Sequence, residues 1–168
     1  MVLTENTTGR LLGKFRGTVT DNRDEARLGR VRAAVPSVST EPLTWAAPCF
    51  PLAGHQVGMI AVPPVGSTVF LEFIDGCIDH PVWVGSAFSE TGQIPDRATT
   101  PDGSSTSILL TADGVGLEIV GGRSITLFCG KGPTITLSAD GIAIDAGSGT
   151  VTVNGRSVDI NNGGLRVQ

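Results

Sequence analysis

Residues 124–145 read Ser-Ile-Thr-Leu-Phe-Cys-Gly-Lys-Gly-Pro-Thr-Ile-Thr-Leu-Ser-Ala-Asp-Gly-Ile-Ala-Ile-Asp, with aliphatic side chains set two positions apart. A period of two predicts strands whose aliphatic side chains share one face. The pattern recurs over residues 107–168, with Gly, Asp or Asn at the turns, and predicts one strand after another. Its aliphatic pairs are Ile108/Leu110, Leu117/Ile119, Ile125/Leu127, Ile135/Leu137, Ile142/Ile144, Val151/Val153, Val158/Ile160 and Leu165/Val167.

Such a ladder carries a continuous aliphatic face that its own short strands cannot cover. About 65 residues in short strands bury too little surface for this, so the face needs either further coils of the same chain or other chains. Seven of the eight Phe and Trp residues lie before residue 103, and Tyr is absent. An aromatic core is therefore expected only in the first part of the chain.

Residues 14–88 are predicted to form a small all-β unit. Alternating segments occur at 14–20, 29–35, 68–74 and 81–86, and a further strand is expected at 57–62 before Pro63-Pro64. About five strands with little helical periodicity fit a small closed barrel, because closure removes the sheet edges. The expected organisation is an arm at 1–13, a barrel at 14–88, a polar, turn-rich linker at 89–106 and the strand ladder at 107–168.

Composition narrows the functional classes. The net charge is −4, and both parts hold more acidic than basic residues, which disfavours nucleic-acid binding. The first residues show no signal-peptide pattern, so synthesis in the bacterial cytoplasm is expected, and no apolar stretch is long enough to span a bilayer. Cys49, Cys77 and Cys129 are expected to be buried small hydrophobes, with a Cys49–Cys77 disulfide as the alternative.

The barrel segments resemble a known family. Its residues are Phe15-Arg-Gly-Thr-Val-Thr-Asp-Asn-Arg-Asp, Leu28-Gly-Arg-Val-Arg-Ala-Ala-Val-Pro, Gly58-Met-Ile-Ala-Val-Pro-Pro-Val-Gly-Ser-Thr-Val-Phe-Leu-Glu-Phe-Ile-Asp-Gly and His80-Pro-Val-Trp-Val-Gly-Ser-Ala-Phe. In this order they resemble the baseplate assembly protein V, or central spike, family of contractile phage tails and related injection systems, which has a Vgr-type OB domain. The turn at Gly76-Cys-Ile-Asp-His-Pro departs from the Gly-Asp-Pro often found in that family.

The resemblance implies an all-β fold, with an OB-type barrel followed by an intertwined trimeric β-helix shaped as a triangular prism. The sixteen residues of the aliphatic pairs would then form the trimer core. The implied protein is a homotrimeric, membrane-piercing spike at the centre of a baseplate in a virion tail or injection particle. Its expected partners are a hub protein at the OB domain, a separate PAAR-like tip protein at the C-terminal end and, transiently, the target cell envelope.

No catalytic, cofactor or metal site is predicted. His55 and His80 lack partners at metal-site spacing, and no His follows residue 80, so the His-x-His iron site of some phage spikes is not expected. Asp75 and Asp79 fit a solvated hairpin tip better than a cation site. Gly130-Lys131-Gly132 lacks the remainder of a phosphate-binding loop.

Two other functions compete with the spike. An OB barrel that binds nucleic acid or glycan on a β-solenoid stalk would need basic strands studded with aromatic residues, which the composition opposes. An acyltransferase on a left-handed β-solenoid would need strict hexapeptide spacing and a histidine in the coils, whereas the pairs here start 7 to 10 residues apart. The spike is therefore the preferred hypothesis, and the chain is not expected to be an enzyme.

Overall fold

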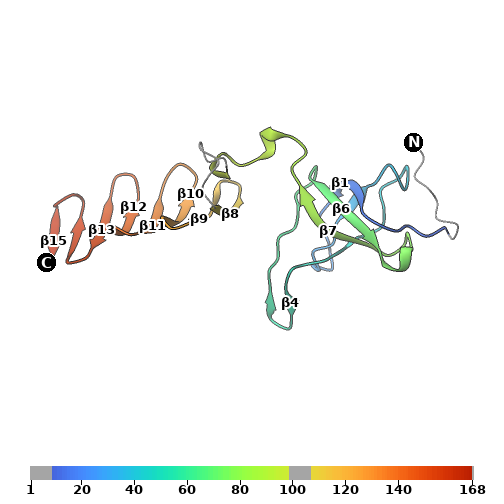
Figure 1. The fold of residues 1–168 in the computed structure, drawn as a ribbon, viewed down its shortest axis with the longest axis horizontal. Helices are drawn as coiled ribbons and strands as arrows, with labels where there is room; N and C mark the ends of the chain where they lie inside the picture. Colours follow the sequence, from blue (N-terminus) through green and yellow to red (C-terminus); the bar gives the residue numbers. More distant parts are fainter. Residues whose placement is uncertain (1–8, 99–106, 168) are drawn as a thin grey trace. The chain divides into compact units, whose positions relative to one another are not determined.

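The computed structural model describes residues 9–98 and 107–167 (Figure 1). The chain divides into two compact units, Met1–Gln93 and Ile94–Gln168. In the described ranges the regular elements are strands and three short 3₁₀ turns, so the all-β prediction is confirmed. The first eight residues of the expected arm, and residues 99–106 of the expected linker, lie outside the described ranges.

The first unit is built on a five-stranded sheet. The strand order is β2-β1-β6-β7-β3, antiparallel except for the β3–β7 pair. The strands are β1 (Phe15–Asp21), β2 (Arg32–Ala34), β3 (Ala47–Pro48), β6 (Thr68–Phe73) and β7 (Pro81–Ala87). The turn η1 (Ile74–Gly76) joins β6 to β7, and η2 (Thr91–Gln93) follows β7. This arrangement agrees with the predicted OB-type barrel.

One face of this sheet forms the core of the first unit. Alternate residues of β1 are buried and exposed, as their period of two predicts. The buried side chains are Phe15, Val19, Val31, Ala33, Val35, Leu43, Ala46, Val69, Leu71, Phe73 and Trp83. Trp83 is polar at one end, and its indole Nε1 donates to the Gly29 carbonyl at 3.1 Å, so the buried ring leaves no polar atom unsatisfied.

Two glycines allow this close packing. A Cβ on Gly17 would lie 2.9 Å from Leu71 Cδ1, and one on Gly29 would lie 2.7 Å from Phe50 Cζ. Gly29 also has a φ of +77°, which side chains rarely tolerate. The Phe50 ring meets Trp83 edge-on, with centroids 5.6 Å apart. The Gly29 backbone therefore packs directly against the Phe50 ring, which in turn packs against Trp83.

The segment before Pro63 differs from its predicted form. Instead of one strand at 57–62, β4 (Ala53–Gly54) and β5 (Val57–Gly58) form a small separate hairpin, and the following residues are irregular. Met59 and Ile60 are exposed, and only Val62, at the end of the segment, packs against the core. The prediction of a strand over the whole of 57–62 was wrong, because regular pairing ends at Gly58 and the apolar residues after it do not join the sheet.

The second unit is an eight-stranded sheet whose strands follow chain order (Figure 1). The unit also contains the short turn η3 (Asp96–Ala98), which precedes the sheet in the chain. The strands are β8 (Ser107–Ala112), β9 (Val115–Val120), β10 (Ser124–Cys129), β11 (Thr134–Ser138), β12 (Gly141–Asp145), β13 (Thr150–Asn154), β14 (Ser157–Ile160) and β15 (Leu165–Val167). Each strand pairs antiparallel with its sequence neighbours. One chain thus forms a meander by itself.

The two faces of this sheet differ in chemistry. One face carries the aliphatic pairs. The other, called the polar face, carries mainly polar residues, such as the neighbouring hydroxyls of Thr126 and Thr136, with Leu109, Val120 and Phe128 as its large apolar members. Phe128 is buried because it lies over Gly116 and beneath the Arg97 guanidinium, which is 4.2 Å from the ring centroid. Arg97 also pairs with Glu118 at 3.1 Å, so η3 is fastened to the polar face.

Candidate trimer interface

The register of the second unit places the aliphatic pairs in two continuous rows. Each pair lies directly opposite the next pair in the neighbouring strand. The first row contains Ile108, Ile119, Ile125, Leu137, Ile142, Val153, Val158 and Val167. The second row contains Leu110, Leu117, Leu127, Ile135, Ile144, Val151, Ile160 and Leu165. All sixteen predicted residues therefore occupy one face by backbone position, although the Val167 side chain lies outside the described part.

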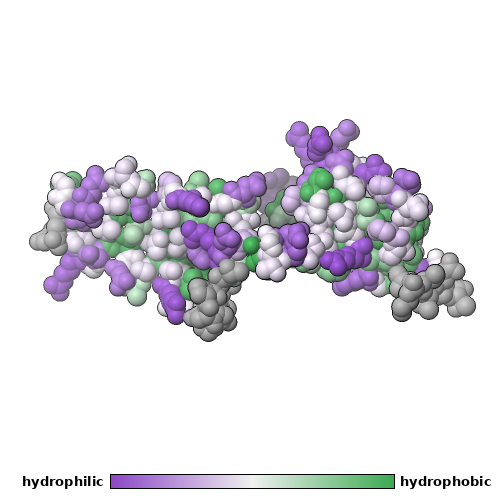
Figure 2. All heavy atoms as spheres, turned by 90° about the horizontal axis from the view of Figure 1, so that it is seen from above, coloured by the Kyte–Doolittle hydropathy of each residue, from purple (hydrophilic) through white to green (hydrophobic). Residues whose placement is uncertain are grey.

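Within one chain these rows remain open to solvent. Ten of the row side chains are exposed, from 39% at Ile135 to 57% at Leu110, while Leu117, Ile119, Val151, Val158 and Ile160 are half-buried. Figure 2 shows hydrophobic atoms at the surface of the second unit, among polar side chains. A contiguous apolar face of this kind is rare on a monomer and marks an interaction surface.

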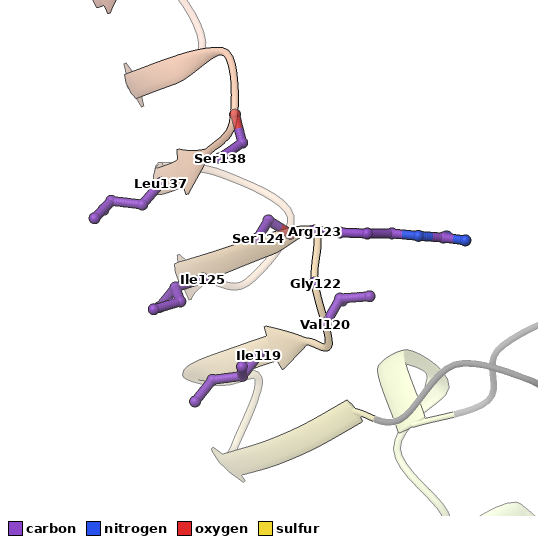
Figure 3. Close-up of a pocket in the computed structure, with 8 residues that line it drawn as sticks. All are labelled: Ile119, Val120, Gly122, Arg123, Ser124, Ile125, Leu137 and Ser138. Atoms are coloured by element: carbon purple, nitrogen blue, oxygen red, sulfur yellow. The ribbon is translucent and has the colours of Figure 1, made fainter.

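Within a row, side chains from successive strands lie close together, as the residues around one surface hollow show. Ile119, Ile125 and Leu137 come from three successive strands and point the same way, whereas Arg123 extends in the opposite direction (Figure 3). The hollow is open, with a volume of about 380 Å³. Three side chains of the apolar face, together with Val120 and polar residues at the turn, line this hollow, so it lies at the border of the apolar face.

Three residues that the sequence reasoning missed extend this face. Ala112, Val115 and Cys129 continue the period of two beyond the predicted pairs and lie opposite one another in register. Val115 and Cys129 are exposed. The alternation in the sequence did indicate Cys129, which stands two positions after Leu127. A search for pairs of aliphatic residues misses a third residue that continues the same alternation.

The cysteines differ from their predicted burial. Cys49 and Cys129 are exposed and Cys77 is half-buried, and all three are free. The prediction of buried cysteines was wrong for Cys49, because a small hydrophobic side chain does not by itself determine where it lies, whereas Cys129 is exposed within one chain and lies on the aliphatic face. The alternative Cys49–Cys77 disulfide is absent as well.

The other candidate groups do not converge on a site. His55, His80 and Asp79 are exposed, and Asp75 lies in the η1 turn with a φ of 54°. In residues 9–98 and 107–167, no three His, Cys, Asp or Glu side chains gather as metal ligands would. No helix in the same ranges is long and apolar enough to cross a bilayer.

The most strongly held polar group is Asp24, in the loop after β1. Its carboxylate accepts from Arg30 Nη2 at 2.6 Å and Nε at 3.1 Å, and from the backbone N–H groups of Ala26, Leu28 and Arg30. These bonds, led by the Arg30 side chain, hold the pKa of Asp24 well below its usual range. Arg30 in turn lies over the Trp45 ring, which fixes the loop against the barrel.

We expect Asp24→Asn to flatten the acid dependence of barrel stability. A carboxyl whose pKa is lower in the folded state adds stability above its unfolded pKa of about 4, and this is lost as pH falls toward the folded pKa. The variant should therefore be less stable than wild type near neutral pH and lose less on acidification. Urea titrations at several pH values measure this, with Glu25→Gln in the same loop as the matched control. Equal pH slopes in Asp24→Asn and wild type would contradict the role of Asp24.

Fold and face together define a class: an all-β protein with an OB-type barrel and a sheet whose apolar face is uncovered in one chain. Comparison with protein families agrees with this class. A model of the type VI secretion system/phage-baseplate injector OB domain matches residues 15–88, and a model of the phage baseplate V C-terminal trimerisation domain matches residues 99–166. The chain belongs to the baseplate V spike family. No curated protein matches it.

The family confirms the resemblance found in the sequence and supplies the coarse function. The chain is a component of a phage or type VI secretion baseplate spike, and the C-terminal match supports a homotrimer. The family consists of structural baseplate proteins.

Proposed function

We propose that three copies of the chain form a membrane-piercing spike at the centre of a contractile baseplate. The observation that carries this is the pair of aliphatic rows, which run through all eight strands and stay exposed in one chain. Three copies facing a common axis would cover them. Each buried aliphatic side chain contributes roughly 1.5–3 kcal/mol, as an upper bound, because the unfolded chain already hides part of this surface.

In this proposal each chain supplies one face of the prism. Every strand from β9 to β14 pairs on both sides with strands of its own chain. Its backbone N–H and C=O groups are therefore satisfied without a strand from another chain. This refines the intertwined β-helix expected from the sequence: the contact between chains is made by side chains on the axis and by turns at the corners. Eight strands at about 4.8 Å give a needle roughly 35–40 Å long.

The remaining parts take their places around this needle. The OB unit would dock on the hub protein, because it is the end of the chain with its own closed core and carries loops such as the one fixed by Asp24. The edge strand β15 would receive a separate tip protein, and the needle would meet the target envelope. The role is mechanical, since continuous backbone hydrogen bonding spreads load across the sheet.

We expect the purified chain to sediment at three times its monomer mass of 17.3 kDa. In the trimer Cys129 faces the axis, so it should react more slowly with an alkylating reagent in the native protein than after denaturation. Cys49, which is exposed on the first unit, serves as the internal control. A stable monomer, or equal Cys129 reactivity in both states, would contradict the proposal.

A further inference from the structure

The turns of the second unit fall alternately on two edges of the sheet, because successive strands are antiparallel and joined in chain order. The first edge holds the turns at 113–114, 130–133, 146–149 and 161–164. The second edge holds the turns at 121–123, 139–140 and 155–156. Each second-edge turn therefore lies one strand beyond the first-edge turn that precedes it in the chain.

Both edges carry charges of alternating sign, in opposite phase. Along the first edge the order is Asp113, Lys131 and Asp145, the last at the end of β12. Along the second edge the order is Arg123, Asp140 and Arg156. All six residues are exposed, and within the described part of the chain none forms an ion pair. Glu118, by contrast, is paired with Arg97 within the chain.

A trimer with threefold symmetry brings these edges together. In such a ring each corner joins the first edge of one protomer to the second edge of the next. All protomers sit at one height, so the slope of the strands decides which turns meet. With one slope a first-edge turn meets the second-edge turn that follows it in the chain, and with the opposite slope it meets the one that precedes it. The two arrangements differ by two strand spacings, about 9.6 Å.

We propose that the charged residues of the turns select the first of these slopes. Each first-edge turn then contacts, on a neighbouring copy of this chain, the second-edge turn that follows it in the sequence. This rests on the proposed trimer and deepens it by naming the contacts at its corners. The selected slope joins opposite charges at three levels: Asp113 with Arg123, Lys131 with Asp140, and Asp145 with Arg156. The opposite slope brings Lys131 to Arg123 and Asp145 to Asp140, which are like charges.

Side-chain packing on the threefold axis does not distinguish the two slopes. Ile, Leu and Val repeat at every level of both rows, so a shifted arrangement meets equivalent aliphatic side chains. The turn charges can distinguish the two slopes because the charged residues lie off the aliphatic face, as Arg123 does in Figure 3. One exposed ion pair is weak, but three levels at three corners act together, and the alternative arrangement is repulsive.

The test is a charge reversal with a swap, made in the full chain. Arg123→Glu should raise the dissociation constant of the trimer about tenfold or more at low salt, and the loss should shrink at high salt. Adding Asp113→Arg should restore the wild-type value, because the pair is rebuilt with its signs exchanged. Sedimentation equilibrium measures the constants, and far-ultraviolet circular dichroism checks that each variant keeps its β structure.

The matched control is Arg123→Glu with Asp79→Arg, which has the same net charge as the swap. Asp79 is exposed on the first unit, so no corner pair is rebuilt with either slope and the trimer should stay weak. A stronger trimer in Arg123→Glu would show the opposite slope, and unchanged trimers in every variant would show that the corners ignore charge. Either result overturns this proposal while leaving the trimer intact. A wild-type monomer would overturn the trimer as well.

Discussion

Leu137→Asp should leave the chain monomeric at concentrations where the wild type is a trimer, and Ile135→Asp should do the same. Both side chains belong to the aliphatic rows of β11, where threefold symmetry would bring three carboxylates into a dry axis. Burying an unpaired charge costs several kcal/mol, and here the cost is paid three times. Analytical ultracentrifugation of each variant measures the outcome.

The control for this prediction lies between the two residues. Thr136 is on the polar face of the same strand, with its hydroxyl beside that of Thr126. Thr136→Asp introduces the same charge without placing it on the axis, so this variant should still assemble. A normal trimer in Leu137→Asp, or loss of the trimer in Thr136→Asp, would show that the aliphatic face does not line the interior.

The second large effect is expected in the barrel. Leu71 is fully buried on β6, with its Cδ1 atom over Gly17, so Leu71→Ala leaves a cavity that the rigid backbone of β1 cannot fill. Such substitutions lower the free energy of unfolding by about 2–5 kcal/mol. Both tryptophans of the chain, Trp45 and Trp83, lie in the first unit. Denaturant titration followed by tryptophan fluorescence therefore reports on the barrel alone.

Leu28→Ala is the matched control, because Leu28 is 61% exposed. Its free energy of unfolding should stay within about 0.5 kcal/mol of wild type. If Leu71→Ala were equally mild, the sheet face formed by β1 and β6 would not be the core. Sedimentation of Leu71→Ala at low denaturant should still give the wild-type mass, since the aliphatic rows are untouched.

Strand positions in the second unit were predictable because one simple rule applies throughout. Every aliphatic pair falls within a strand, and turn lengths bring each pair opposite the next. A period of two specifies which residues share a face, but it does not specify what covers that face. For this reason the sequence predicted the rows, whereas their role as a trimer core stays a prediction.

Other features depend on contacts that periodicity does not encode. Phe128 is buried on the polar face because Gly116 leaves room beneath it and Arg97, from η3, covers it. The hydrogen-bond network around Asp24 depends on the path of the polar loop after β1. The composition of this segment predicted a loop but not the path that the loop takes. The segment 57–62 was predicted as one strand, whereas only Val57–Gly58 is paired, because local β propensity is weak where tertiary contacts do not support it.

The meander of β8–β15 also bears on how the length of such a spike can change. Each strand contacts only its chain neighbours, so stability accrues hairpin by hairpin, as in repeat proteins. Removing or duplicating one hairpin keeps every remaining side chain on its original face and every remaining turn on its original edge. The length of the sheet can therefore change in steps of two strands, or about 9.6 Å. Reach can thus evolve by gain and loss of hairpins while the barrel stays the same.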